Sequence, residues 1–136
     1  MGKYKNFKWL GSLEYPNKVR EFLTEIDVYA LITGIDMSPL TLQEVQLMKK
    51  PVIATNVGGV SEVMKNNETG FLVDEGNADE LIKKLSLIIE DEDKMEIMGI
   101  AGRKFIEGNF SWDIIAKQFV DILIKNGLMK KYEYKK

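Results

Sequence analysis

The sequence predicts an α/β domain with a parallel sheet of about four strands flanked by helices. Short runs of uncharged, mostly apolar residues alternate along the chain with longer segments whose apolar residues recur at three-and-four spacing. Such short runs are typical of strands covered on both faces, and the longer segments are typical of amphipathic helices. Strands that alternate with helices form parallel sheets with right-handed crossovers.

The first four expected elements precede residue 50. The aromatic and apolar run Phe7–Leu10 ends at Gly11 and predicts a strand. Pro16–Ile26 carries apolar residues at helical spacing, and the uncharged run Val28–Ile32 predicts a second strand. Leu40–Lys49 is the next expected helix. Its apolar positions include Leu40, Val45 and Met48, and its C-terminus carries lysine, which is favourable at the negative end of the helix dipole.

The second half of the chain predicts two more strands and several helices. Pro51–Ala54 is fully apolar and predicts a strand, after which Gly58-Gly59 turns the chain into a short helix that ends near Met64. Phe71–Val73 predicts one further strand. The remaining expected elements are helices at 79–89, 94–107 and 111–125.

The segment DMSPLTLQEVQLMKKPVIATNVGG, residues 36–59, carries the clearest functional pattern. Pro39 fixes φ near its helical value and Ser38 can cap the helix, so the first turn offers free N–H groups and a partial positive charge to a phosphate or diphosphate. Glu44 lies one to two turns further along, where its carboxylate can accept hydrogen bonds from a ribose diol. An anion seat beside a diol acceptor fits a nucleotide-sugar.

The same segment resembles the donor-binding signature of the family 4 retaining glycosyltransferases, which have the GT-B fold. That signature is a glutamate, seven residues, a second glutamate, a helix rich in Ala and Met, a Pro-Val-Val/Ile-Ala-Thr strand and a Gly-Gly-x-x-Glu turn. Here the second glutamate matches Glu44 and the strand matches Pro51–Thr55. The turn matches Gly58, Gly59 and Glu62.

The resemblance extends over nearly the whole chain. Thr69–Val73 resembles the family's next strand, and Phe110–Trp112 resembles the start of its C-terminal helix. The departure is Asp36, which stands where the family has its first glutamate and is shorter by one methylene. The resemblance implies a Rossmann-like, nucleotide-sugar-binding C-terminal domain that is truncated at its N-terminal side.

The resemblance also implies the site. Asp36, directed towards the hexose, and Glu44, on the ribose, are the candidate catalytic residues. The implied donor-binding residues are Ser38, Pro39, Leu40, Thr41, Leu42, Glu44, Gly58 and Gly59. The donor would be a UDP- or GDP-hexose, transferred with retained configuration and without a metal or cofactor. Residues 91–93, Asp-Glu-Asp, are expected to be a solvated loop rather than a metal site.

Two strand–helix units of the family pattern are missing before the first expected strand, and with them a Gly-Arg turn and a lysine that neutralise the donor phosphates. Arg20 and Arg103, the arginines of the chain, fall inside expected helices. An unpaired strand edge forfeits hydrogen bonds that contribute about 1 kcal/mol each. We therefore expect Phe7–Leu10 to pair directly beside Val28–Ile32, or a partner to complete the sheet.

Two classes of function remain open. The chain is a donor-binding glycosyltransferase domain with little or no activity in isolation, or it is a non-catalytic nucleotide-sugar-binding or partner-docking module that completes a separate acceptor-binding N-terminal half. A homo-oligomer is a further way to complete it. A third interpretation, a flavodoxin-like signalling domain, lacks the expected acidic cluster at the end of a first strand.

Composition limits the remaining choices. The net charge of −2 argues against nucleic acid as a partner, and the absence of cysteine and histidine excludes thiol chemistry and the commonest general base. We expect one domain at 1–126 and a basic tail at 127–136, whose contact with a membrane is at most peripheral. The N-terminus lacks the apolar core of a signal peptide, which predicts a cytoplasmic protein.

Overall fold

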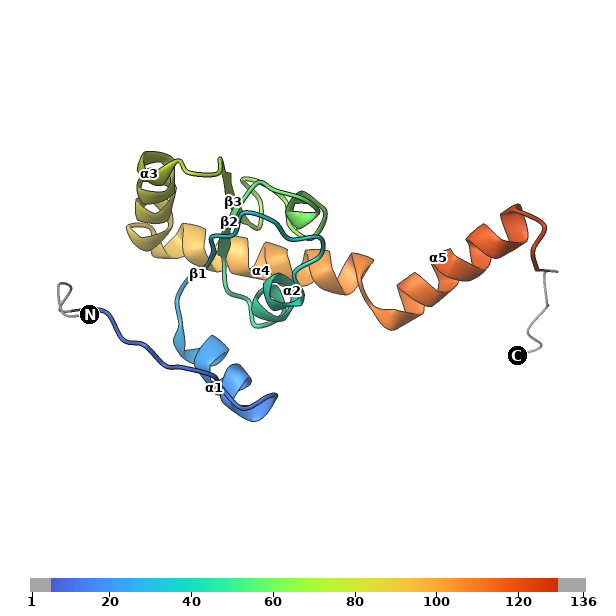
Figure 1. The fold of residues 1–136 in the computed structure, drawn as a ribbon, viewed down its shortest axis with the longest axis horizontal. Helices are drawn as coiled ribbons and strands as arrows, with labels where there is room; N and C mark the ends of the chain where they lie inside the picture. The colour runs from blue at the N-terminus through green and yellow to red at the C-terminus, as the bar shows by residue number, and fades with distance from the viewer. Residues whose placement is uncertain (1–5, 130–136) are drawn as a thin grey trace.

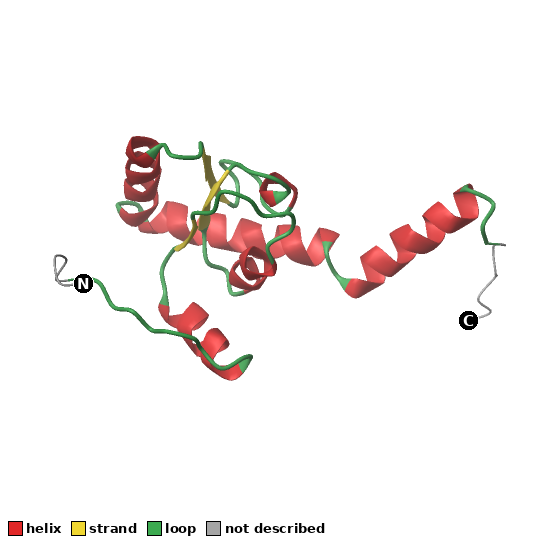
Figure 2. Ribbon diagram, in the orientation of Figure 1, coloured by secondary structure: helices red, strands yellow, loops and turns green. Residues whose placement is uncertain are grey.

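The computed structural model describes residues 6–129, and its helices and strands alternate as the sequence predicts (Figure 1). The strands lie at the centre of the domain with helices around them, as Figure 2 shows. In chain order the elements are α1 (Asn17–Glu25), β1 (Tyr29–Leu31), α2 (Leu40–Leu47), β2 (Val52–Thr55), the 3₁₀ turn η1 (Val60–Glu62), β3 (Gly70–Val73), α3 (Ala78–Ile89), α4 (Glu92–Asn109) and α5 (Trp112–Lys125).

The sheet has three parallel strands in the order β1-β2-β3, with Ala30 beside Ile53 and Ile53 beside Phe71. The parallel α/β prediction is confirmed, but the predicted strand at Phe7–Leu10 is wrong. Those residues form no strand and are exposed, and in residues 6–129 the outer edge of β1 pairs with no other strand. Direct pairing of Phe7–Leu10 beside β1 is therefore also wrong, since an apolar run forms a strand only where a neighbour accepts its hydrogen bonds.

Each face of the sheet has its own apolar core, because successive side chains of a strand point to opposite faces. Val52 and Ala54 of β2 pack with the buried Leu42 and Val45 of α2 on one face, and α1 adds Leu23. On the other face, the buried side chains are Ile53, Phe71, Val73, Ile88 of α3 and Met98 of α4. The two cores hold α2 against the sheet on the face opposite to α3.

Helix α4 lies directly against the C-terminal end of α2. A Cβ added to Gly99 of α4 would lie 2.0 Å from the carbonyl oxygen of Lys49, so only glycine allows this approach. The fully buried Gln46 of α2 donates from Nε2 to the carbonyl oxygens of Leu42 (2.9 Å) and Val63 (2.8 Å). These contacts fix where α2 ends, and therefore where its N-terminus points.

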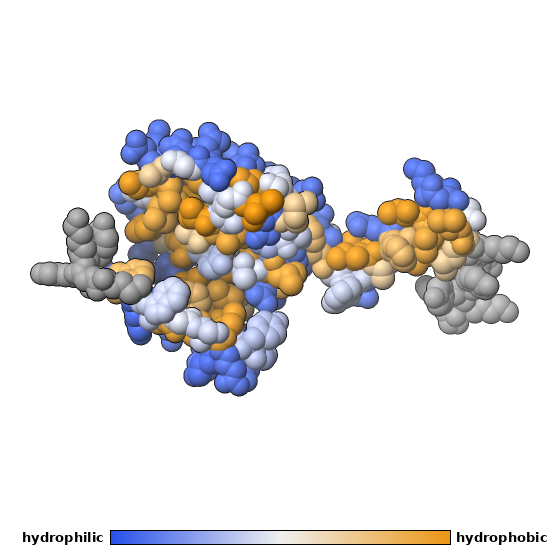
Figure 3. All heavy atoms as spheres, viewed as in Figure 1, coloured by the Kyte–Doolittle hydropathy of each residue, from blue (hydrophilic) through white to orange (hydrophobic). Residues whose placement is uncertain are grey.

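Helix α5 projects away from the domain and buries none of its residues (Figure 1). The Ser111 hydroxyl caps it by accepting a hydrogen bond from the Ile114 N–H at 3.4 Å. Figure 3 shows apolar side chains along this projecting helix. Its large exposed apolar residues include Trp112, Phe119 and Ile122. None of the helices described in residues 6–129 is both long and apolar enough to cross a membrane.

Lys49 offers a test of the local backbone at the end of α2. Its φ of 58° is left-handed, a conformation that costs a residue with a Cβ more than it costs glycine. We expect Lys49→Gly to raise the free energy of unfolding by about 0.5–1 kcal/mol in urea denaturation. Lys50→Gly is the matched control and should bring no gain, because Lys50 does not have a positive φ. A loss of stability in Lys49→Gly would contradict this backbone assignment.

Candidate functional site

The candidate site lies at the carboxyl ends of β1 and β2, where open α/β sheets bind their ligands. The loop at residues 32–39 follows β1 and leads into α2, and the turn at residues 56–59 follows β2. The structure brings these two segments together, since the Gly59 N–H donates to the Asp36 carbonyl oxygen at 2.9 Å. Asp36 and the glycine turn, which are well separated in the sequence, therefore belong to one site.

The two glycines of this turn have different roles. Gly58 has a φ of +53°, a left-handed conformation that glycine adopts readily, whereas Gly59 has an ordinary φ of −93°. A Cβ at Gly58 would lie 2.1 Å from the Asp36 carbonyl oxygen, and a Cβ at Gly59 would lie 1.8 Å from that of Met37. Both glycines are thus required by the close approach of the loop backbone, and Gly58 also by its φ.

Thr55, at the end of β2, anchors the other end of the same loop. Its side chain is 2% exposed, and its Oγ1 accepts a hydrogen bond from the Thr33 N–H at 3.0 Å and donates one to the Thr33 carbonyl oxygen at 2.6 Å. From the sequence, Thr55 was predictable only as part of the strand motif. The available signal was a hydroxyl at the end of an apolar strand, because a buried hydroxyl requires a hydrogen-bond partner.

The N-terminus of α2 has no side-chain cap. Pro39, with φ −66° and ψ 110°, occupies the N-cap position, and Ser38 is exposed and bonds to no N–H of the first turn. The expectation that Ser38 caps the helix is wrong. The helix begins at Leu40, so Pro39 occupies the N-cap position and Ser38 lies one residue before it. Leu42 is fully buried, so the amides of Leu40 and Thr41 lie at a helix end that is held in place but uncapped.

The predicted donor-binding residues fall into a buried group and an exposed group. Pro39, Leu42 and Gly59 are buried, and the N–H groups of Leu42 and Gly59 already donate to the carbonyl oxygens of Pro39 and Asp36. Leu40 and Thr41 are exposed together with Ser38 and Gly58. The apolar Ile35, Met37 and Leu40, each at least 70% exposed, surround this helix end.

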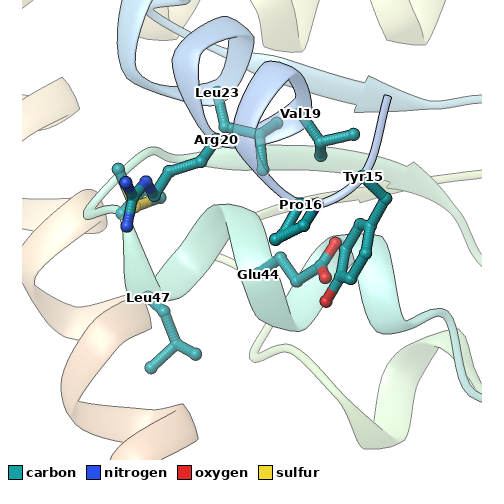
Figure 4. A pocket seen from close by; sticks show the side chains of 8 residues that line it. Tyr15, Pro16, Val19, Arg20, Leu23, Glu44 and Leu47 are labelled. Carbon is teal, nitrogen blue, oxygen red and sulfur yellow. The ribbon is translucent and has the colours of Figure 1, made fainter. Parts of the chain in front are cut away.

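Glu44 opens onto a groove of about 210 Å³ between α1 and α2. The residues that line it are Tyr15, Pro16, Val19, Arg20, Leu23, Glu44, Leu47 and Met48. Figure 4 shows the Glu44 carboxylate directed into the groove beside Tyr15 and Pro16. The half-buried carboxylate has no hydrogen bond or ion pair with a side chain in residues 6–129, so its oxygens can accept hydrogen bonds from a ligand.

The family model described as glycosyl transferases group 1 matches residues 1–105. The chain belongs to this family. One relative is 32% identical to this chain over 126 residues. It is the GDP-mannose-dependent monoacylated alpha-(1-6)-phosphatidylinositol monomannoside mannosyltransferase of Corynebacterium glutamicum. The match covers 88% of the chain, which spans about a third (32%) of that protein's length.

Two solved structures share the fold of this group 1 domain. The C-terminal domain of the group 1 glycosyltransferase LpcC from Francisella tularensis has a TM-score of 0.69 at 20% identity, and the match covers 76% of this chain and 53% of that one. HepE from Anabaena, solved in complex with UDP-glucose, has a TM-score of 0.68 at 24% identity over 77% of this chain and 29% of that one. The predicted fold, part of a GT-B C-terminal half, is confirmed.

Tyr15 and Arg20 line the groove of the group 1 domain, although no motif in the sequence predicts them as site residues. Tyr15 precedes α1 and Arg20 lies within it, while Glu44 lies on α2. In Figure 4, Tyr15 is beside Glu44, whereas Arg20 extends towards the end of the groove where Leu47 lies. Helix packing alone brings these residues to Glu44, so spacing along the sequence gave no signal for them.

The acidic run at residues 91–93 begins α4 in this domain. The Asp91 carboxylate is the N-cap and accepts a hydrogen bond from the Lys94 N–H at 2.9 Å, and Glu92 and Asp93 lie in the first turn, where acids favour the helix dipole. The run is exposed, but it is a helix start rather than a loop. In residues 6–129, no group of three or more acidic side chains is arranged to hold a metal ion.

The backbone contact between the glycine turn and the loop can be tested with Gly59→Ala. The added Cβ would collide with the Met37 carbonyl oxygen, and overpacking of this kind lowers the free energy of unfolding by about 1–3 kcal/mol. Urea denaturation measures the change. Gly108→Ala in α4 is the matched control: its Cβ meets no atom within 4 Å, so it should unfold at the wild-type urea concentration or higher. Wild-type stability in Gly59→Ala would show that the two backbones are not in contact.

Proposed function

We propose that this chain is the donor-binding part of a retaining glycosyltransferase and binds a nucleotide-activated hexose at α2. The proposal depends mainly on one observation: the Glu44 carboxylate, which has no hydrogen bond or ion pair in residues 6–129, lies beside the uncapped N-terminus of the same helix. Membership of the group 1 family supports it. The GDP-mannose dependence of the Corynebacterium relative and the UDP-glucose bound by HepE support a nucleoside-diphosphate hexose as the ligand class.

Each part of the ligand has a group suited to it. The N–H groups of Leu40 and Thr41 and the positive end of the helix dipole would hold the diphosphate. Glu44 would accept hydrogen bonds from the ribose hydroxyls, and Asp36 would face the hexose. In transfer with retained configuration, the bond from the anomeric carbon to the diphosphate oxygen breaks. The helix N-terminus would then stabilise the charge that develops on that leaving group.

The test is a calorimetric titration of the chain with UDP, UDP-glucose and GDP-mannose, repeated on Glu44→Ala. Loss of hydrogen bonds to a charged acceptor should weaken binding by about 10- to 150-fold, which corresponds to 1.5–3 kcal/mol. Glu96→Ala, an exposed position on α4, should bind like the wild type. Equal affinity of Glu44→Ala and the wild type would show that Glu44 does not contact the donor.

A second function, docking of a partner that completes the sheet, is favoured by the edge of β1, which pairs with no other strand in residues 6–129. The Tyr29 N–H donates to the Pro51 carbonyl oxygen at 3.1 Å, so the backbone groups of Ala30 point away from β2, where a further strand could bond to them. Beside this edge is an open groove of about 830 Å³ between β1, α3 and α4. Its lining residues are Ile26, Asp27, Val28, Ala30, Leu85, Ile89, Glu92 and Met95.

The partner that this edge fits is a strand–helix unit, supplied by a separate acceptor-binding half or by a second copy of the chain. The LpcC C-terminal domain supports this, since about half of that domain lies outside the match. We therefore expect the isolated chain to show little or no transfer. Release of hexose from UDP-glucose or GDP-mannose measures it, and turnover of about 1 s⁻¹ or faster, a rate ordinary for enzymes, would contradict the docking function.

A further inference from the structure

Tyr15 forms the wall of the α1–α2 groove that faces Glu44. The Tyr15 side chain is 70% exposed, and its ring stands next to the Glu44 carboxylate in Figure 4. Its hydroxyl bonds to no group within residues 6–129. An aromatic ring held at the mouth of a groove, with a face free and no structural bond, is available to a ligand.

The rest of the groove suits a flat apolar group. Pro16, Val19 and Leu23 from the side of α1 and Leu47 and Met48 from α2 contribute apolar surface. The groove volume of about 210 Å³ is below the ~300–1,000 Å³ of pockets that enclose a whole drug-sized ligand. It therefore fits one ring system with part of its attached sugar rather than a complete nucleotide-sugar.

We propose that Tyr15 is the platform on which the nucleotide base stacks, an inference that rests on the proposed function. With the diphosphate at the start of α2 and the ribose diol on Glu44, the base attached to that ribose extends into the same groove. The ring of Tyr15 is the exposed π-face beside it. Stacking on an aromatic side chain accepts every base. Tyr15 therefore gives affinity for the nucleoside without choosing between uridine and guanosine.

A structural role for Tyr15 would have a different signature. The side chain is mostly exposed and without a hydrogen bond in the described part of the chain, so Tyr15→Leu should fold with wild-type stability. Tyr15→Phe keeps the π-face and loses only the hydroxyl. Phe119→Leu removes an aromatic side chain of similar exposure, 61%, from α5 and is the matched control.

The experiment is a calorimetric titration of the wild type and these variants with UDP, GDP and ribose 5-phosphate. Tyr15→Leu should weaken UDP and GDP binding about 5- to 150-fold, the range for loss of one base–aromatic stack, with affinity for ribose 5-phosphate unchanged. Tyr15→Phe and Phe119→Leu should bind all three ligands like the wild type. Urea denaturation of each variant confirms that the fold is retained.

The outcomes separate this inference from the proposed function. If Glu44→Ala loses UDP binding while Tyr15→Leu keeps it, the proposed function stands and Tyr15 is not the base platform. Equal weakening of UDP and ribose 5-phosphate by Tyr15→Leu would also overturn the inference, because the ring would then act on the sugar or on the fold. A wild-type chain that binds neither UDP nor GDP would overturn the proposed function itself, and the inference with it.

Discussion

The site depends on the contact between two stretches of backbone, the Gly58-Gly59 turn after β2 and the Asp36–Met37 loop after β1. One hydrogen bond joins them, from the Gly59 N–H to the Asp36 carbonyl oxygen at 2.9 Å, and any side chain on either glycine would push them apart. Helix α2 begins three residues after Met37, so this contact decides where the helix N-terminus lies relative to the sheet. The position of the proposed diphosphate seat follows from it.

Other contacts secure the same helix along its length. Thr55 bonds to both backbone groups of Thr33 at the start of the loop, and the buried Gln46 ties the helix to the segment after η1. These hydrogen bonds of Thr55 and Gln46 join backbone groups and so fix the position of the loop and of α2. Within residues 6–129, the Glu44 carboxylate and the first turn of α2 have no side-chain partner. The helix is rigidly placed and its polar groups remain open, which is the arrangement that binding a ligand with little reorganisation requires.

Two features of residues 6–129 indicate a surface that meets other protein. The edge of β1 pairs with no other strand, and several large apolar side chains are exposed. Ile35, Met37 and Leu40 are exposed around the helix end, and the groove beside β1 is lined largely by apolar side chains. Exposed apolar patches of this kind mark surfaces that meet other protein. The match covers 53% of the LpcC C-terminal domain, so that domain is larger than the part whose fold this chain shares.

Local chemistry explains how much of this could be predicted from the sequence. The strand Val52–Thr55 and the turn at Gly58 were predictable from local residues. A short apolar run favours a buried strand, and glycine is the residue that favours a tight turn with positive φ. Phe7–Leu10 resembled a strand equally well. A strand also needs a neighbouring strand to pair with, and four residues of sequence cannot show whether such a neighbour is present. Likewise, Tyr15 reaches Glu44 only through the packing of α1 on α2, which no spacing in the sequence encodes.

The most direct test of the central claim, that the N-terminus of α2, placed by the glycine turn, seats the donor diphosphate, is an NMR titration of the ¹⁵N-labelled chain with UDP. We predict that the largest amide shifts fall on Leu40 and Thr41, whose N–H groups form the proposed seat, and on Gly58 and Gly59, whose turn contacts the loop that leads into α2. UDP binding that shifts amides of α3 or α4 and leaves those four unchanged would contradict the account.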